Sequence, residues 1–133
     1  MQVCRRYFKL NVGEEHFRDL ETQALAEALK LDEHVLGLGG GAVIREQNRK
    51  LIRASAAKVI YLRCDPQELL RRIQSDQLTA KMRPNLTSLG GGIEEIRQVL
   101  AGREPIYREL KHMELDVTRM SPNDAVVHIA RLL

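Results

Sequence analysis

A continuous apolar run in the middle of the chain constrains the fold most. Residues 59–62 read Val-Ile-Tyr-Leu, without the polar alternation of a strand that has one face in water. Strands buried on both faces are typical of parallel sheets covered by helices on each side. Asp65 and Pro66 follow as an N-cap and a first helical residue, with Glu68 at the spacing of a capping box. The segment therefore predicts a strand over residues 58–63 that leads directly into a helix.

The rest of the chain alternates helical and strand patterns. Apolar residues recur every three or four positions over residues 14–30, and further helices are predicted over residues 45–54, 93–103, 105–112 and after Ser121. The last of these is expected to turn Val126, Ile129 and Leu133 inward. Short apolar strands are predicted over residues 35–38 and 115–118. Alternating strands and helices indicate an α/β protein with a parallel sheet, here as a single domain over residues 1–133.

Composition excludes several classes of function. The net charge is +3, with two Phe, three Tyr and no Trp, so neither a basic surface nor stacking aromatics for nucleic acid are expected. No apolar run approaches the ~20 residues of a membrane span. Cys4 and Cys64 are isolated and the four histidines are scattered, so no metal site is predicted. Isolated cysteines fit a reducing cytoplasmic location.

Two glycine triplets mark candidate loops. Gly39, Gly40 and Gly41 follow the strand predicted at residues 35–38. Glycines let a backbone approach a ligand closely, and ligands of parallel α/β sheets bind beyond the carboxyl ends of strands. The alternative is a simple flexible turn. The second triplet, Gly90 to Gly92, ends a polar stretch over residues 75–92 that we interpret as a lid loop; no Lys-Ser/Thr follows it, as a phosphate-binding loop would require.

Three arginines stand on separate predicted elements: Arg18, Arg83 and Arg103. The planar guanidinium binds a carboxylate or phosphate through two parallel hydrogen bonds. One interpretation is that the three arginines converge on a single anion. The alternative is that each is a solvated surface charge.

Five motifs, taken together and in order, resemble the shikimate kinase family over almost the whole chain. The first is Gly13-Glu14-x-x-Phe17-Arg18-x-x-Glu21, and the second is the glycine triplet with Ala42 and Val43. The apolar run of residues 59–62 with Pro66-x-x-Leu69-Leu70 follows. Arg83-Pro84 and the segment from Arg103 to Glu109, Arg-Glu-Pro-Ile-Tyr-Arg-Glu, complete the series.

The resemblance implies a three-layer α/β/α parallel sheet of the P-loop kinase type. It also implies transfer of the γ-phosphoryl group of ATP, with Mg²⁺, to the 3-hydroxyl of shikimate in aromatic amino-acid biosynthesis. Arg18 and Arg103 would bind the shikimate carboxylate, and the backbone of Gly39, Gly40 and Gly41 would contact the substrate. Arg83 would neutralise charge on the phosphates as a catalytic residue, and Arg119 and Pro122 would border the adenine.

The chain departs from the family at its beginning. Family members start with a central strand, a loop ending in Gly-Lys-Ser/Thr, and an Asp-x-Asp strand end, and none of these occurs here. Three explanations are open. The chain is a truncated kinase, or it is a non-catalytic protein that binds shikimate-like acids or a partner protein. In the third, it forms an oligomer in which a neighbouring copy completes the sheet, although members of the family are monomers. Residues 1–133 alone are expected not to phosphorylate shikimate. Another small P-loop kinase, such as gluconate kinase, is the alternative enzyme class.

Overall fold

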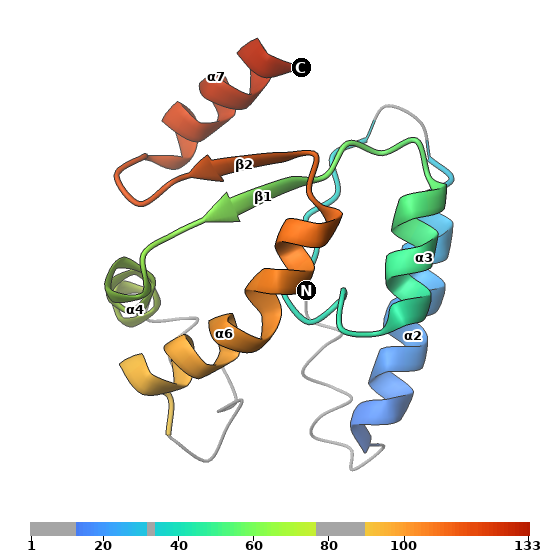
Figure 1. Ribbon diagram of the computed structural model, residues 1–133, viewed down its shortest axis with the longest axis horizontal. Coiled ribbons are helices and arrows are strands. Elements are labelled where there is room, and N and C mark those ends of the chain that lie inside the picture. The colour runs from blue at the N-terminus through green and yellow to red at the C-terminus, as the bar shows by residue number, and fades with distance from the viewer. Residues whose placement is uncertain (1–12, 32–33, 77–89) are drawn as a thin grey trace. The chain divides into compact units, whose positions relative to one another are not determined.

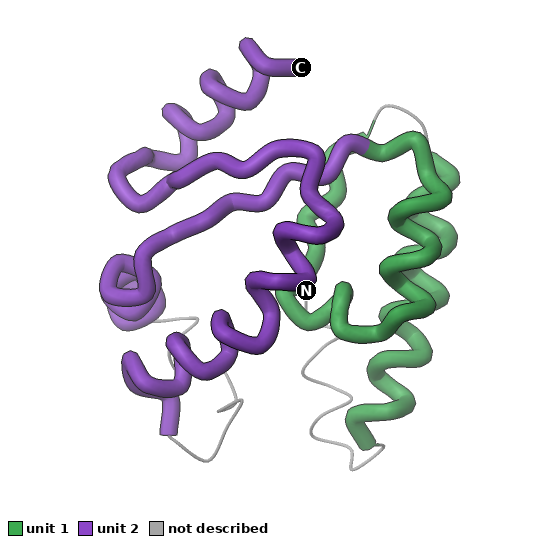
Figure 2. The backbone as a smooth tube through the Cα atoms, viewed as in Figure 1, with its two compact units in different colours: residues 1–57 green, residues 58–133 purple. Residues whose placement is uncertain are grey.

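The computed structural model describes residues 13–31, 34–76 and 90–133. The chain forms two compact units, residues 1–57 and residues 58–133 (Figure 2). In unit 1, helices α2 (Gly13–Ala28) and α3 (Glu46–Ala54) lie side by side (Figure 1). The helices predicted over residues 14–30 and 45–54 are confirmed. One domain over residues 1–133 stays a prediction.

The strand predicted over residues 35–38 is wrong. This segment has no regular secondary structure, Val35 is fully exposed, and Leu38 is 44% exposed. A strand satisfies its backbone N–H and C=O groups by pairing with a neighbour. No described strand pairs with residues 35–38, since the sheet of the described part joins only two strands elsewhere in the chain. Without a partner among the described strands, this apolar segment is irregular and exposed.

Unit 2 contains the sheet. Strands β1 (Ile60–Arg63) and β2 (Met113–Asp116) pair in parallel, with Ile60 opposite Met113. Both predicted strands are confirmed, although the second begins two residues earlier than expected. Burial of β1 on both faces is wrong, because the side chain of Leu62 is 50% exposed. The two described strands leave β1 without a neighbour on its other edge, so its middle is reached by solvent.

Helix α4 (Pro66–Ser75) begins at the predicted residue. The Asp65 side chain accepts a hydrogen bond from the backbone N–H of Gln67 at 2.9 Å, and Pro66 fills the first helical position. The capping box predicted for Glu68 is wrong. Its carboxylate instead accepts charge-assisted hydrogen bonds from Arg71 and Arg72, each 2.7 Å long. Such bonds are stronger than a bond to a neutral backbone N–H.

The two helices predicted over residues 93–103 and 105–112 are a single helix, α6 (Ile93–Leu110), with Pro105 inside it. Proline lacks the N–H donor and its ring crowds the carbonyl four residues back, so it bends a helix. Figure 1 shows α6 bending along its length. The predicted break is therefore a bend. A membrane-spanning helix is not found among the described helices, of which α6, with 18 residues, is the longest.

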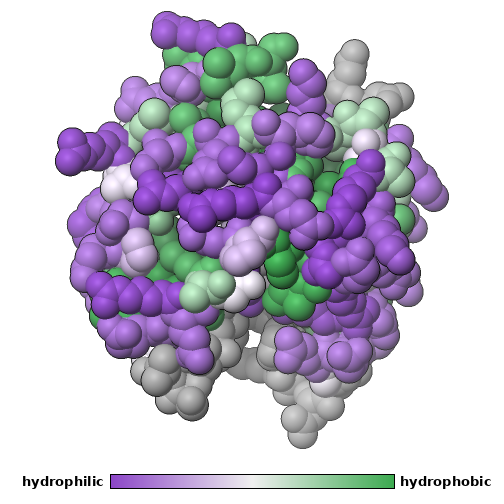
Figure 3. All heavy atoms as spheres, viewed as in Figure 1, coloured by the Kyte–Doolittle hydropathy of each residue, from purple (hydrophilic) through white to green (hydrophobic). Residues whose placement is uncertain are grey.

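Helix α7 (Pro122–Leu132) starts in a capping box formed by Ser121 and Asp124. It packs on the core of unit 2 through Ala125 and Ile129, four residues apart. Val126 and Leu133, which were predicted to face inward, are 65% and 67% exposed, because the inward stripe runs through Ala125 instead. Apolar side chains accordingly reach the surface over α7 (Figure 3). The core itself consists of Cys64, Leu115, Val117 and Ala125, with Leu69, Met120 and Ile129 packed against it.

Candidate functional site

Arg18 on α2 is held firmly by neighbouring side chains. Its side chain is 14% exposed, and Nη1 donates to the Glu21 carboxylate at 2.7 Å. Glu14, one turn earlier, lies 3.6 Å from Nη2 and is itself 67% exposed. The guanidinium also lies 5.3 Å from the centre of the Phe17 ring. Glu21 therefore fixes the guanidinium, whereas the contact with Glu14 is long and open to water.

Residues 39–44, which we call the glycine turn, lie against Arg18. A Cβ built on Gly41 would stand 2.8 Å from both Nη1 and Nη2 of Arg18, closer than any side chain tolerates. A Cβ on Gly39 would stand 3.9 Å from Oε1 of Glu21. Positive φ angles occur elsewhere, at Gly13, Gly90 and Gly91 among the described residues. A side chain at position 41 would therefore displace the end of the Arg18 side chain, whereas the backbone of Gly41 needs no positive φ.

Helix α3 holds the other side of the turn. Asn48 Nδ2 donates to the carbonyl of Ala42 at 2.7 Å, and Arg49 Nη1 donates to those of Val43 and Ile44 at 2.8 and 2.6 Å. Sequence reasoning saw only a short basic helix here. The missed signal is that Asn48 and Arg49 stand three and four residues after Arg45, which places all three side chains near one another on a helix.

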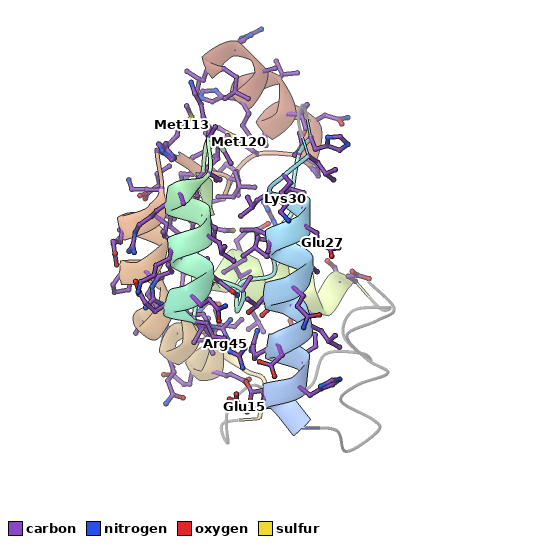
Figure 4. The ribbon with its side chains drawn as sticks, turned by 90° about the vertical axis from the view of Figure 1, so that its right-hand side faces the viewer. Glu15, Glu27, Lys30, Arg45, Met113 and Met120 are labelled. Atoms are coloured by element: carbon purple, nitrogen blue, oxygen red, sulfur yellow. The ribbon has the colours of Figure 1, made fainter. Side chains whose placement is uncertain are left out.

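Arg45 ties the start of α3 to α2. It donates to Asp19 at 2.6 Å and to Glu15 at 2.8 Å, and Figure 4 shows Arg45 and Glu15 pointing toward one another from their two elements. The hydrogen bond with Asp19 is the main cause that raises the pKa of Arg45. The turn and Arg18 therefore belong to one hydrogen-bonded assembly within unit 1.

The remaining predicted substrate ligands lie elsewhere. Arg103 is a half-buried residue of α6 in unit 2, and its side chain makes no hydrogen bond or ion pair with another residue that the structure describes. Because Arg18 and Arg103 belong to different units, their convergence on one anion stays a prediction. Arg83, with most of the predicted lid, lies outside the described residues.

A cavity of about 550 Å³ opens at the carboxyl ends of β1 and β2. Pockets of roughly 300–1,000 Å³ are the usual size for small ligands. Arg119 lines it, and Pro122 follows as the first residue of α7. Its complete lining is Arg63, Asp65, Asp116, Thr118, Arg119 and Met120. The cavity is where parallel sheets bind ligands, and it includes one of the two residues predicted to border adenine.

The carboxylates of this cavity are already engaged. Asp116 forms an ion pair with Arg63 and accepts from the Thr118 hydroxyl at 2.6 Å and its N–H at 3.0 Å. The Thr118 hydroxyl is the main cause that lowers the pKa of Asp116. Asp65 caps α4. The described residues include no group of three His, Cys, Asp or Glu side chains that could hold a metal ion.

Arg72 of α4 supports the loop behind the cavity, and sequence reasoning missed it. Its Nη2 donates to the carbonyls of Val117, Thr118 and Met120 at 2.9, 3.2 and 3.3 Å. Its Nε donates to Glu68, whose pKa is lowered to about 2 by hydrogen bonds from Arg71 and then Arg72. Nothing in the sequence separates Arg72 from the adjacent Arg71, because only the fold brings one of them to the loop.

A comparison with solved structures defines the class of this α/β protein as the P-loop kinase fold. A structure described as "Shikimate kinase from Acinetobacter baumannii in complex with shikimate" matches 96% of the chain and 68% of that protein, with a TM-score of 0.82 and 30% sequence identity. The family profile described as "Shikimate kinase" matches residues 2–133. The chain therefore belongs to the shikimate kinase family, as its motifs indicated.

Curated relatives agree with this assignment. A shikimate kinase of Rhodopirellula baltica is 33% identical over 121 residues, which cover 91% of this chain and 64% of the relative. A shikimate kinase of Enterococcus faecalis is 38% identical over 127 residues, covering 96% of this chain and 71% of the relative. The chain thus spans less than two thirds of the Rhodopirellula relative.

Proposed function

We propose that this chain serves the ATP-dependent phosphorylation of the shikimate 3-hydroxyl, and that the assembly in unit 1 supplies the shikimate side of the reaction. The observation that carries the proposal is the Arg18 guanidinium held within 2.8 Å of the Cβ position of Gly41. An oriented guanidinium beside bare backbone is suited to a small carboxylic acid, which needs a planar cation and close access.

Arg18 has donors left for such an acid. A guanidinium carries five N–H groups, and Glu21 takes one of them at 2.7 Å. Glu14 is exposed and 3.6 Å away, so an arriving carboxylate displaces it at small cost. However, Glu14 and Glu21 together with Arg18 give the site a net negative charge. A second cation is needed to attract an anion here, and Arg103, which has no described partner, is the residue we propose.

We further propose that the cavity of unit 2 receives the adenine end of ATP, bordered by Arg119 and Pro122. The pairing of Asp116 with Arg63 leaves little net charge at this place. That balance favours an uncharged base over a phosphate, since a phosphate would meet the Asp116 and Asp65 carboxylates. ATP supplies the transferred phosphoryl group, and Arg83 would neutralise charge on its phosphates. The buried Cys64 thiol is free, which fits the cytoplasmic location that we propose.

Calorimetric titration tests the acid site. Shikimate is expected to bind the chain, and shikimate methyl ester, which lacks the anionic carboxylate, is expected to bind at least ~10-fold more weakly, since charge-assisted hydrogen bonds contribute about 1.5–3 kcal/mol. Arg103→Ala should weaken shikimate binding similarly. Arg97→Ala on the same helix is the matched control, because Arg97 is 54% exposed and pairs only with exposed Glu94 among the contacts described. Equal binding of acid and ester would reject the proposal.

A non-catalytic acid-binding protein is the second candidate. The 133 residues contain no Gly-Lys-Ser/Thr sequence, the element that cradles phosphates in P-loop kinases. A coupled assay of ADP release with shikimate and Mg-ATP separates the two roles for residues 1–133. We expect no turnover from these residues alone; turnover above ~1 s⁻¹, the low end of typical enzymes, would exclude the purely binding role.

A further inference from the structure

The most buried side chain in the described part of the molecule is polar. Asn48 of α3 has 0% of its surface exposed, and it is the largest side chain buried to this degree. Polar groups removed from water are normally hydrogen-bonded, because burial without a partner is costly. The full burial of a polar side chain at position 48 therefore needs an explanation, whereas that of an apolar side chain would not.

The two ends of the Asn48 carboxamide are used unequally. Nδ2 donates to the Ala42 carbonyl at 2.7 Å, while Oδ1 has no hydrogen-bond partner among the described residues. An aliphatic side chain would avoid the unpaired oxygen altogether. The described contribution of the amide is therefore the hydrogen bond that Nδ2 donates to the Ala42 carbonyl in the glycine turn.

The turn depends on α3 for its backbone partners. Two hydrogen bonds close it internally, from Ala42 N–H to the Gly39 carbonyl at 2.9 Å and from Ile44 N–H to the Gly41 carbonyl at 3.1 Å. Its next three carbonyls, those of residues 42–44, all accept from Asn48 or Arg49. Among the described strands, none pairs with the preceding segment, residues 35–38. Side chains of α3 therefore supply the described hydrogen bonds to these three carbonyls.

The opposite side of the turn is the acid site. Gly41 has no room for a Cβ beside Arg18, so a small displacement of the turn changes the space around the guanidinium directly. Ala42, one residue later, is 3% exposed and carries the carbonyl that Asn48 holds. The bond from Asn48 is consequently one residue away from the contact that shapes the site.

We propose that Asn48 is a positioning residue for acid binding: its buried amide fixes the turn of residues 39–44 and thereby sets the distance between Gly41 and Arg18. The inference rests on the proposed function, since it assigns Asn48 to the same acid site. It touches no ligand itself, because it is fully buried.

Asn48→Leu tests the positioning role. It removes the donor and the unpaired Oδ1 while keeping the number of heavy atoms, and it leaves the Ala42 carbonyl without that donor, so the urea midpoint is expected to fall while the protein stays folded. Shikimate affinity should fall at least ~10-fold in calorimetry, and the amides of Ala42 and Ile44 should exchange hydrogen at least ~10-fold faster. Gln47→Leu, the same change at an exposed neighbour on α3, should alter none of the three. Unchanged affinity and unchanged exchange in Asn48→Leu would overturn the inference.

Two further measurements cover the cases in which Asn48→Leu does not fold or the unchanged protein does not bind shikimate. If Asn48→Leu does not fold, Arg49→Met serves instead, because Arg49 is 17% exposed and its loss frees the carbonyls of Val43 and Ile44. Faster exchange at the Ile44 amide supports the inference, and unchanged exchange there overturns it. If the unchanged protein fails to bind shikimate, the proposed function fails; hydrogen exchange of the turn in Asn48→Leu then still decides whether Asn48 positions it.

Discussion

The glycine turn of unit 1 and the loop of residues 117–120 in unit 2 are held by the same device. In each, an arginine of a neighbouring helix donates to successive backbone carbonyls: Arg49 to two in the turn, and Arg72 to three in the loop. The difference lies in what precedes each segment. The loop follows a paired strand and packs on a core, whereas the turn follows an exposed segment that pairs with no described strand.

This difference predicts where substitutions act. Arg72 joins α4 to the loop of residues 117–120, which packs on the core through Val117 and Met120, so removing it should cost stability. In the turn, Ala42 and Val43 are buried, but a Cβ on Gly41 would meet only the end of the Arg18 side chain, so a change at Gly41 should cost ligand affinity more than stability.

Arg72→Leu should lower the free energy of unfolding by about 2–3 kcal/mol, because three carbonyls and Glu68 lose a charged donor. Arg71→Leu is the matched control on the next residue. Its side chain is 66% exposed and pairs with Glu68 alone among the contacts described, so a change within about 0.5 kcal/mol is expected. Urea unfolding measures both. Equal losses in the two variants would show that the loop contacts of Arg72 contribute nothing.

Gly41→Ala should weaken shikimate binding about 10-fold, equivalent to about 1.4 kcal/mol, because the new methyl group pushes the Arg18 guanidinium out of place. The urea midpoint should change little, since the guanidinium is the mobile end of a long side chain. Gly37→Ala is the control, as a Cβ there meets nothing within 4 Å. Should both variants bind shikimate like the unchanged protein, close approach at Gly41 would have no role in the site.

Acid should destabilise unit 2 partly through Glu68. Its pKa is lowered to about 2 in the folded protein, from about 4.3 in an unfolded chain. The carboxylate therefore contributes its full stabilisation above the unfolded pKa, and this is lost as pH falls from about 4.5 toward 2. Glu68→Gln should flatten the fall of the urea midpoint over that range and have its largest effect at neutral pH. A slope identical to that of the unchanged protein would contradict the assignment.

Sequence patterns predicted where helices begin better than they predicted strand pairing or the continuation of α6 through Pro105. The caps at Asp65 and Ser121 were predictable because an N-cap is a local hydrogen bond between near neighbours. Residues 35–38 were not, because whether an apolar segment becomes a strand depends on a partner far along the chain. Pro105 likewise bends α6 instead of ending it, since enough packing and hydrogen bonds continue past it.

The candidate site divides in the same way. Arg18 and the glycines were predicted from motif resemblance, and the structure places Gly41 beside Arg18, while the approach of their backbone to a ligand stays a prediction. Asn48 and Arg72 were not predicted, because both act on backbone carbonyls, which carry no sequence signature. Residues that position a site through the main chain are visible only once the fold places them.

The central claim is that Arg18, held by Glu21 against Gly41, binds the carboxylate of a small acid. Calorimetric titration of shikimate into Arg18→Gln tests it most directly, with Arg53→Gln, a 41% exposed arginine of the same unit, as control. Arg18→Gln is expected to lose about 100-fold in affinity, or about 2.7 kcal/mol, and the control is expected to change less than twofold. Shikimate affinity in Arg18→Gln within twofold of the unchanged protein would contradict the claim.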